Sequence, residues 1–172
     1  MNPILKLNRE QFIAKLSEIY EKSPWVAEQV WNKNLSDQQK TIKSLHIHMK
    51  NIVEEAKPEQ KYKLLNNHPE LSSNFFKKAG LTIASKKEQR GAGLDKCTPA
   101  ESNELLSLNT RYRATFTFPF IIAVKGRTIS DILEQLNKRL LNSPDIEFGI
   151  ALNEVHNIAL LRLMEVFGKP ST

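Results

Sequence analysis

Start signals for α-helices recur along the whole sequence, and they limit the possible folds more than any other feature. Thr98-Pro99 followed by Glu101 is a capping box with proline in the first helical turn, and Asn8 with Gln11 has the same spacing. Further starts are indicated at Ser23-Pro24, Ser36 with Gln39, Lys57-Pro58, Thr128 or Ser130, and Ser143-Pro144. Apolar residues then recur at helical spacing. The pattern predicts about seven to nine helices, several of them short.

One run, residues 114–124 (ATFTFPFIIAV), alternates like a β-strand. Pro119 in its middle argues against a central strand, and a single strand would have no partner. We therefore expect an extended piece that enters a short buried helix or turn. Together with the helix signals, this predicts an all-α fold with one compact domain over residues 1–172.

The composition excludes several classes of protein. Hydrophobic residues make up 40% and charged residues 26% of the 172 residues, as in soluble globular proteins. No uncharged apolar run approaches the roughly 18 residues of a membrane span, and the polar N-terminus does not match a signal peptide. A single cysteine, Cys97, excludes an internal disulfide and a cysteine-rich metal site. A cytoplasmic protein without membrane attachment is the simplest expectation.

The net charge of +6 is spread over the chain. Nucleic-acid binders usually concentrate Lys and Arg on one stripe, often with aromatic residues for stacking. Here the basic residues are scattered, for example Lys33, Lys43, Lys77, Lys86, Arg90, Arg113, Lys125 and Arg139. No histidine pair has the i, i+4 spacing of a helical zinc site. We expect no nucleic-acid partner and no metal.

His68 stands directly before Pro69, which disfavours helical geometry at the histidine. The imidazole is therefore expected at a break between helices. Such a residue is either a surface or packing residue, or a catalytic acid–base, and the pattern alone leaves both readings open. His46 and His48 lie on an amphipathic helix without an acidic partner at useful spacing, and His156 fits a satisfied core position or an interface position.

The stretch SKKEQRGAGLD, residues 85–95, is the second unusual segment. Ser85 and Glu88 have capping-box spacing, and Gly91 and Gly93 would end the helix soon afterwards. A helix N-terminus with free N–H groups is also a natural anion site. A plain cap and a functional role are both consistent with these residues.

The segment FTFPFIIAVKG, residues 116–126, is apolar but loop-like. Pro119 leaves backbone N–H and C=O groups without helical partners, and buried groups of this kind need a partner. A polar ligand lying against them would supply one. For the side chains of Phe118, Phe120 and Ile121, core packing is expected in any case.

Arg162 shares an apolar helical stripe with residues at three- and four-residue spacing, namely Leu152, Val155, Ala159 and Val166. A buried guanidinium without a partner is costly, so it must be paired. The partner is either an internal acid, the commoner case, or the carboxylate of a substrate, which the planar fork grips with two hydrogen bonds.

Taken together, these segments resemble the 2-oxo-4-hydroxy-4-carboxy-5-ureidoimidazoline (OHCU) decarboxylase family, from about residue 5 to residue 167. The matching pieces, in order, are Leu7-Asn8, SPWVAE at 23–28, HPEL at 68–71, LT then S..EQ.GAGLD from 81 to 95, LN..Y at 108–112, FPFIIAVKG at 118–126 and IALLRL at 158–163. Their order and spacing make the match specific. Three departures are Thr117, where the family has glycine, Cys97 in place of leucine, and residues 31–39, which lack the usual Arg-Pro-Phe.

The resemblance implies an all-helical homodimer that completes the conversion of uric acid to (S)-allantoin without a cofactor. It implies His68 as the catalytic acid–base and Glu88 as a second catalytic carboxylate, with Arg162 facing the substrate carboxylate. The remaining implied contacts with the substrate are Pro69, Ser85, Lys86, Lys87, Gln89, Phe120, Ile121, Ile122, Ala123 and Val124. It also implies a functional association with the preceding 5-hydroxyisourate hydrolase.

Two other functions compete with this reading. Amphipathic helices with a basic surface are also typical of a non-catalytic helical interaction module, which predicts a shallow apolar groove and no effect of His68 on a reaction. A family member that has lost activity is the third reading, because Thr117 departs from the family pattern.

Overall fold

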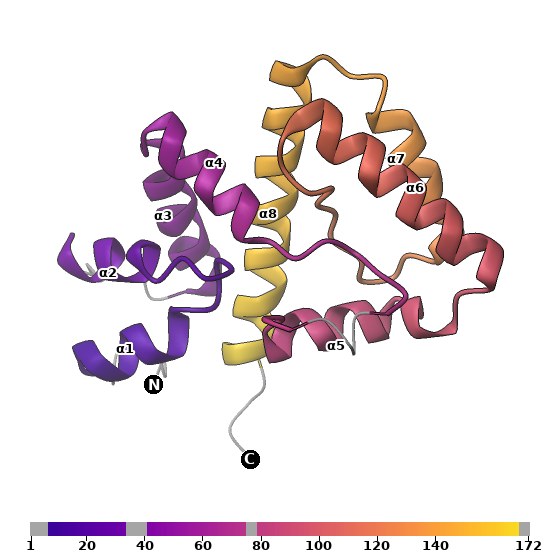
Figure 1. Cartoon of the computed structure of the whole chain (residues 1–172). Coiled ribbons are helices and arrows are strands. Elements are labelled where there is room, and N and C mark those ends of the chain that lie inside the picture. The colour runs from indigo at the N-terminus through magenta and orange to yellow at the C-terminus, as the bar shows by residue number, and fades with distance from the viewer. Residues whose placement is uncertain (1–6, 34–40, 75–78, 169–172) are drawn as a thin grey trace. The chain divides into compact units, whose positions relative to one another are not determined.

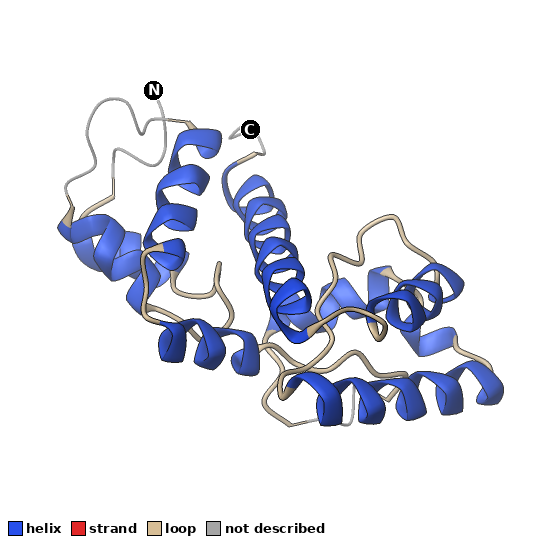
Figure 2. Ribbon diagram, turned by 90° about the horizontal axis from the view of Figure 1, so that it is seen from above, coloured by secondary structure: helices blue, strands red, loops and turns tan. Residues whose placement is uncertain are grey.

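Eight α-helices make up most of the described chain in the computed structural model, which describes residues 7–33, 41–74 and 79–168. Figure 2 shows helices joined by loops, and no strand is drawn within these ranges. The predicted all-α class is confirmed. In chain order the helices are α1 Arg9–Leu16, α2 Trp25–Asn32, α3 Ile42–Glu54, α4 Pro58–Asn67, α5 Ile83–Gly91, α6 Pro99–Phe116, α7 Ile129–Arg139 and α8 Pro144–Phe167.

Capping chemistry sets the helix boundaries, largely as the sequence predicts. Asn8, Thr98 and Thr128 each accept a hydrogen bond from the third helical N–H and complete a capping box. Thr128, not Ser130, therefore opens α7. The prediction for α2 is wrong in detail, because Pro24 holds the cap position and the Ser23 hydroxyl donates instead to the Glu21 carbonyl.

The start of α3 differs from the sequence-based expectation. The predicted cap at Ser36 lies outside the described residues. In the described chain, α3 begins after Thr41, which forms a reciprocal capping pair with Ser44. Its buried face consists of Leu45, Met49, Ile52 and Val53.

The chain divides into two units, Met1–Asn67 with His156–Thr172, and His68–Val155. In the first unit, α1 packs on α2 and α2 on α3 (Figure 1). The rings of Phe12 and Trp31 lie 5.3 Å apart at the α1–α2 contact. Much of the core of this unit consists of buried apolar side chains, including Phe12, Leu16, Ile19, Val26, Val30, Leu45, Met49, Leu64 and Leu65.

A buried polar chain crosses the core of the first unit. The Tyr20 hydroxyl lies 2.8 Å from Nδ1 of His156, and Nε2 of the same imidazole lies 3.0 Å from the Glu54 carboxylate. The second imidazole, His46, reaches the His156 carbonyl through Nε2 at 2.8 Å. His156 is therefore a satisfied core residue, one of the two roles that the sequence left open. Burial outweighs the attraction of Glu54 and lowers the pKa of His156 to about 4.

In the second unit, α6 and α7 lie side by side (Figure 1). Aromatic rings from the end of α6 and from the segment after it form a cluster. Tyr112 is the centre of this cluster, with ring centroids of Phe116, Phe118 and Phe120 between 4.7 and 6.0 Å away. Residues 117–124 have no regular secondary structure and end in a turn. The predicted extended piece is therefore shorter than residues 114–124, because Ala114 to Phe116 form the last turn of α6.

Helix α6 ends at a residue with unfavourable backbone geometry. Thr117 closes it with φ 65° and ψ 7°, in the left-handed region, and its N–H donates to the Arg113 carbonyl. Glycine is the usual residue at this position of a helix, because a β-branched side chain is sterically strained there. The left-handed geometry thus explains why a glycine suits this position. It also explains why the threonine is expected to lower the stability of the fold.

No described helix is both long enough and apolar enough to cross a membrane.

Replacing Thr117 with glycine should stabilise the protein. Relief of the left-handed strain is worth about 1–2 kcal/mol, and the greater freedom of glycine in the unfolded chain returns part of it. We expect thermal unfolding of Thr117→Gly a few degrees above that of the native chain. Thr117→Ala is the control, since it keeps the Cβ and should gain much less. Equal gains in both variants would contradict the strain explanation.

The unfolding free energy should fall as the solution is acidified below about pH 6.5. The folded state holds the pKa of His156 near 4, whereas an unfolded histidine titrates near 6.5, so the unfolded state binds more protons in this window. The loss attributable to this residue should reach roughly 2–4 kcal/mol near pH 4. His46 contributes in the same direction, because burial lowers its pKa. Denaturant titrations of the native chain and of His156→Gln should show a smaller loss on acidification in the variant.

Candidate active site

His68 lies directly after the last residue of α4 and opens the second unit. Its side chain is buried, with 6% of the residue exposed, so the reading as a surface residue is wrong. Pro69 beside it is half-buried. The proline keeps His68 out of helical geometry, which is why the chain leaves the helix here and holds the imidazole inward.

The segment after His68 is anchored by two amide side chains. The Ser72 N–H donates to Oε1 of Gln89 at 3.1 Å, and Nδ2 of Asn109 donates to the Leu71 carbonyl at 2.8 Å. Gln89 belongs to α5 and Asn109 to α6. Both amides are 2% exposed, so the segment is fixed by buried hydrogen bonds from two helices.

Helix α5 begins earlier than its sequence suggests. Thr82 is its cap and accepts from the Ser85 N–H, so Ser85 is not a cap and does not form a capping box with Glu88. Ser85 is instead the third residue of α5, and its N–H already donates to the Thr82 hydroxyl, so it is not a free N–H for an anion. The Gly93 turn is confirmed, with φ 73°. The earlier start lengthens α5 to nine residues.

The predicted site residues on α5 differ in their exposure to solvent. Ser85 and Gln89, one turn apart, are both 2% exposed. Lys86 and Glu88 are half-buried and Lys87 is exposed. Thus α5 brings Ser85, Gln89 and Glu88 to neighbouring positions, and Gln89 connects them to the His68 segment.

The orientation of the Gln89 amide follows from its contact. The Ser72 N–H is a donor, so the atom it meets must be the oxygen of the amide. The amide nitrogen of Gln89 is buried and has no hydrogen-bond partner among the described residues.

A small hollow of about 60 Å³ lies beside the same segment. Its lining includes Leu71, Ser72, Ser102, Leu105 and Asn109, and the buried Oδ1 of Asn109 has no partner among the described residues. Ligand pockets usually measure roughly 300–1,000 Å³. This hollow is therefore too small to be a substrate site.

The predicted segment Phe120 to Val124 is deeply buried. Phe120, Ile121, Ile122 and Val124 are 1–5% exposed, and Ala123 is half-buried. The Val124 carbonyl accepts from the Arg127 N–H, which closes the turn after the segment.

Charged side chains bind the backbone of this segment at three points. Arg139 donates to the Ile121 carbonyl at 2.7 Å, Glu154 accepts from the Ala123 N–H at 2.7 Å, and Nε of Arg127 donates to the Ala123 carbonyl at 3.0 Å. Charged groups form stronger hydrogen bonds than neutral ones. The backbone of the segment is thus held from outside by α7, α8 and the loop before α7.

Arg139 belongs to a buried ion-pair cluster. Its Nε and one terminal nitrogen lie 2.7 and 2.6 Å from Oε1 of Glu147, which is fully buried. Tyr112 donates to the same carboxylate oxygen, and Asn142 donates to the other at 2.8 Å. The guanidinium also lies 4.5 Å from the centre of the Phe120 ring. Burial, the largest cause, and the bond to Glu147 both raise the pKa of Tyr112.

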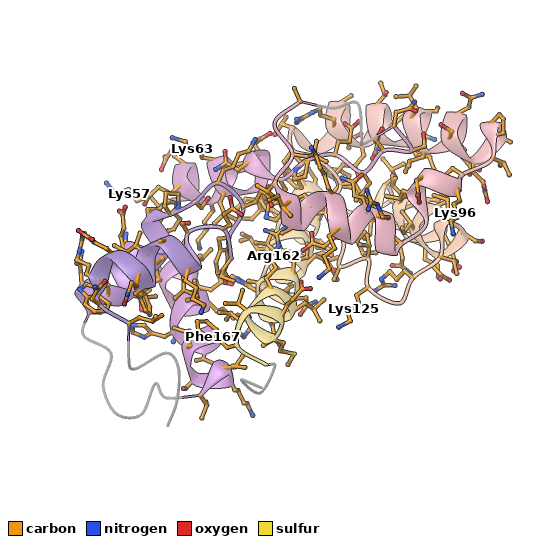
Figure 3. The ribbon with its side chains drawn as sticks, turned by 90° about the horizontal axis from the view of Figure 1, so that it is seen from below. Lys57, Lys63, Lys96, Lys125, Arg162 and Phe167 are labelled. Carbon is orange, nitrogen blue, oxygen red and sulfur yellow. The ribbon has the colours of Figure 1, made fainter. Side chains whose placement is uncertain are left out.

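Arg162 lies in the first unit, on the second half of α8 (Figure 3). It is 5% exposed, as its apolar stripe predicts. One guanidinium nitrogen donates to the Glu18 carbonyl at 2.9 Å and lies 2.8 Å from the carboxylate of Glu21, which is fully buried. The internal acid, one of the two partners considered from sequence, is therefore present.

Hydrogen bonds connect two of the predicted segments to the surrounding helices. The contacts join the His68 segment to α5 through Gln89, and they join Phe120 to Val124 to α7 and α8. Sequence reasoning missed the residues that hold this framework. Arg139 looked like one of many scattered basic residues, yet it is 6% exposed. Asn109, Tyr112, Glu147 and Glu154 were also missed. A signal was available for the first two, because both belong to the LN..Y motif.

Metal-ligating side chains do not gather in the described part of the chain. No group of three His, Cys, Asp or Glu side chains there is arranged to hold a metal ion.

Comparison with known proteins identifies relatives along almost the whole chain. Residues 5–164 match the family described as OHCU decarboxylase. A 2-oxo-4-hydroxy-4-carboxy-5-ureidoimidazoline decarboxylase of Halalkalicoccus jeotgali is 37% identical over 159 residues, covering 92% of this chain and 86% of that protein. A "uric acid degradation bifunctional protein" of Bacillus sp. strain TB-90 is also 37% identical, over 94% of this chain but only 31% of its own length.

A solved structure has the same fold. The crystal structure of an (S)-allantoin synthase superposes with a TM-score of 0.75 at 31% sequence identity, covering 95% of this chain. This chain spans about half of that protein, 52% of its length. The match at the level of family, sequence and fold leads to one conclusion: the chain belongs to the OHCU decarboxylase family.

Proposed function

We propose that this chain decarboxylates OHCU to (S)-allantoin without a cofactor, a carbon–carbon bond cleavage that makes it a carboxy-lyase. The observation that carries the proposal is the buried His68 segment, fixed by Gln89 of the helix that also carries Glu88, in a member of this family. A buried imidazole whose chain segment is fixed by hydrogen bonds supports a role in proton transfer, which needs a positioned acid–base.

The reaction needs orientation and proton management more than an electron sink. The bond between the ring carbon and its carboxylate breaks, CO₂ leaves, and the adjacent ring C=N takes up the electron pair. The ring nitrogen that receives the electron pair takes up a proton from the solvent. The hydroxyl on the same carbon then gives up its proton to become the product carbonyl, and a proton is added to the neighbouring ring carbon. Delivery from one face makes the product a single enantiomer.

Each predicted site residue has a role in this proposal. His68 takes the hydroxyl proton or delivers the proton to carbon, and Glu88 within reach would select its tautomer. Arg162, oriented by Glu21, faces the substrate carboxylate, which a guanidinium suits by charge and shape. Pro69 and the α5 residues Ser85, Lys86, Lys87 and Gln89 line the pocket with the backbone of residues 120–124.

The wider setting of the enzyme belongs to the same proposal. Residues 1–172 act as one domain in a cytoplasmic homodimer, and the activity follows that of a 5-hydroxyisourate hydrolase. The bifunctional relative supports linkage to other steps of uric acid degradation, because the matching segment is there part of a longer chain.

The proposed activity is tested with freshly made product of urate oxidation after the preceding hydrolase step. Adding the protein should accelerate allantoin formation and give optically active (S)-allantoin. Racemic allantoin formed at the uncatalysed rate would exclude the enzyme and favour the non-catalytic interaction module.

His68→Ala should lower kcat by about 10²–10⁴-fold, the usual contribution of a positioned acid–base. Because His68 is buried, the thermal unfolding of the variant is measured in parallel. His68→Gln keeps the size of the side chain without its basicity and should be equally inactive. The control is His48→Gln, a half-buried histidine on α3, which should retain full activity. An active, folded His68→Gln would contradict the assigned role.

Arg162→Lys should raise KM about tenfold, because lysine cannot make the two-pronged contact with a carboxylate. It should also lower the melting temperature, since the buried pair with Glu21 is disturbed. A melting temperature that falls while KM stays unchanged would assign Arg162 to structure alone. Glu21→Gln separates the two effects, because it weakens the internal pair and leaves the guanidinium in place.

A further inference from the structure

The chain between α1 and α2 contacts α8 at a single nitrogen of Arg162. The Glu18 carbonyl lies 2.9 Å from Nη1, and the Glu21 carboxylate lies 2.8 Å from the same atom. The guanidinium is planar and rigid, so two contacts at one nitrogen also fix the direction in which the other nitrogens point. The orientation of Arg162 therefore depends on where the turn of residues 18–21 lies.

Tyr20, in the middle of this turn, is held at a second point on α8. Its hydroxyl lies 2.8 Å from Nδ1 of His156, which precedes Arg162 by six residues, or about 9 Å along the helix axis. Tyr20 is 1% and His156 is 2% exposed. A turn that is held at one point can still pivot about it. Contacts at two points of one helix fix its position.

The proton in this contact is placed by Glu54, the last residue of α3. Its ionised carboxylate lies 3.0 Å from Nε2 of His156 and can only accept, so Nε2 carries the proton. A neutral imidazole then has its acceptor at Nδ1, and the Tyr20 hydroxyl donates to it. Burial favours these forms, because it lowers the pKa of His156 and raises the pKa of Tyr20. The hydrogen bond therefore has one direction, and its loss leaves a buried acceptor without its donor.

We propose that Tyr20 and His156 are positioning residues for Arg162. Their hydrogen bond holds the turn in the place from which the Glu18 carbonyl and the Glu21 carboxylate direct the guanidinium at the carboxylate of a bound anionic heterocycle. A functional side chain keeps its geometry only when the residues behind it are themselves fixed. The inference rests on the proposed function in one respect, that Arg162 faces a ligand carboxylate.

Two stable probes measure this carboxylate contact without turnover. Hydantoin-5-acetate carries a carboxylate on a small planar ring, and hydantoin-5-acetamide has nearly the same shape without the charge. The ratio of their dissociation constants is measured by calorimetry at one ionic strength. We expect the native chain to bind the anion at least about tenfold more tightly than the amide, on the scale of a hydrogen bond between charged groups. Equal affinity of the two probes would overturn the inference.

Tyr20→Phe removes the hydroxyl and keeps the ring. It should reduce the preference for the anion about three- to tenfold, on the scale of one hydrogen bond. It should also raise KM for OHCU by a similar factor and leave kcat nearly unchanged. His156→Leu should have the same effects. His156→Gln keeps one acceptor and one donor, so it should retain more of the preference than His156→Leu does.

The matched control is Ile52→Val, on the buried face of α3. It weakens the core of the same unit and leaves the contact between Tyr20 and His156 in place. Its thermal unfolding should fall, while its preference for the anion and its KM stay as in the native chain. A similar loss of preference in Ile52→Val and Tyr20→Phe would overturn the inference.

A double-mutant cycle tests whether Tyr20 acts through Arg162. The guanidinium is absent in Arg162→Lys, so adding Tyr20→Phe to that variant should change the ratio by less than about twofold. An equally large effect of Tyr20→Phe in both backgrounds would assign the residue to stability alone. Where the double variant does not fold, the comparison of His156→Gln with His156→Leu carries the test.

The outcomes also separate this inference from the proposed function. If the chain turns over OHCU and folded Tyr20→Phe keeps the native ratio and KM, only the inference fails. If the chain forms no (S)-allantoin but loses its preference for the anion in Tyr20→Phe, the proposed function fails and the positioning role stands. Where neither probe binds, KM and kcat for OHCU decide in the same way. Absence of both binding and turnover would overturn both.

Discussion

The buried carboxylate of Glu147 is the contact on which the second unit depends. It receives the guanidinium of Arg139, the hydroxyl of Tyr112 and the amide of Asn142, so α6, α7, α8 and the loop between the last two meet at one side chain. A buried ion pair of this kind gives little net stability compared with apolar packing, but breaking it by removing one partner costs several kcal/mol. Its value here is geometric. It places a fixed cation against the Ile121 carbonyl, and this hydrogen bond fixes the position of the backbone at the start of residues 121–124.

The first unit also contains a buried arginine that is held by a buried glutamate. Arg162 is fixed by Glu21 and by the Glu18 carbonyl, and Tyr20 in the same stretch is fixed by His156. The stretch from residue 18 to residue 21 is thus joined to α8 by three polar contacts: the ion pair of Glu21 with Arg162, the hydrogen bond from Arg162 to the Glu18 carbonyl, and the hydrogen bond between Tyr20 and His156. Both units therefore present a buried arginine whose orientation is set by a fully buried glutamate.

The helix boundaries could be predicted from sequence because they depend on local chemistry. The capping boxes at Asn8, Thr98 and Thr128 involve residues three apart, and no distant contact overrides them. Ser85 was misassigned because two overlapping cap signals compete, and Thr82, one turn earlier, holds the cap. The buried Arg139 could not be predicted, because its partner Glu147 lies on another helix and no local spacing pairs them.

The candidate site, like the fold, was predictable where it depends on local sequence and not where it depends on distant contacts. The resemblance to the OHCU decarboxylases named the segments, and family membership is confirmed. The burial of His68 and the anchors Gln89 and Asn109 come only from tertiary contacts, since each hydrogen bond joins residues 17 or 38 positions apart. Local patterns contain no information at that range. What the sequence left open for His68, surface or interior, depended on how the next two helices pack.

The amide of Gln89 has a consequence for selectivity. Its oxygen is already committed to the Ser72 N–H, so rotation by half a turn would set two donors against each other. The contact therefore fixes the position of the buried NH₂ group, which can only donate, and another hydrogen-bond donor placed against that group would be disfavoured. A glutamine amide can present either its oxygen or its NH₂ group when it is free to rotate. Here a single hydrogen bond from a backbone N–H fixes which of the two faces which side.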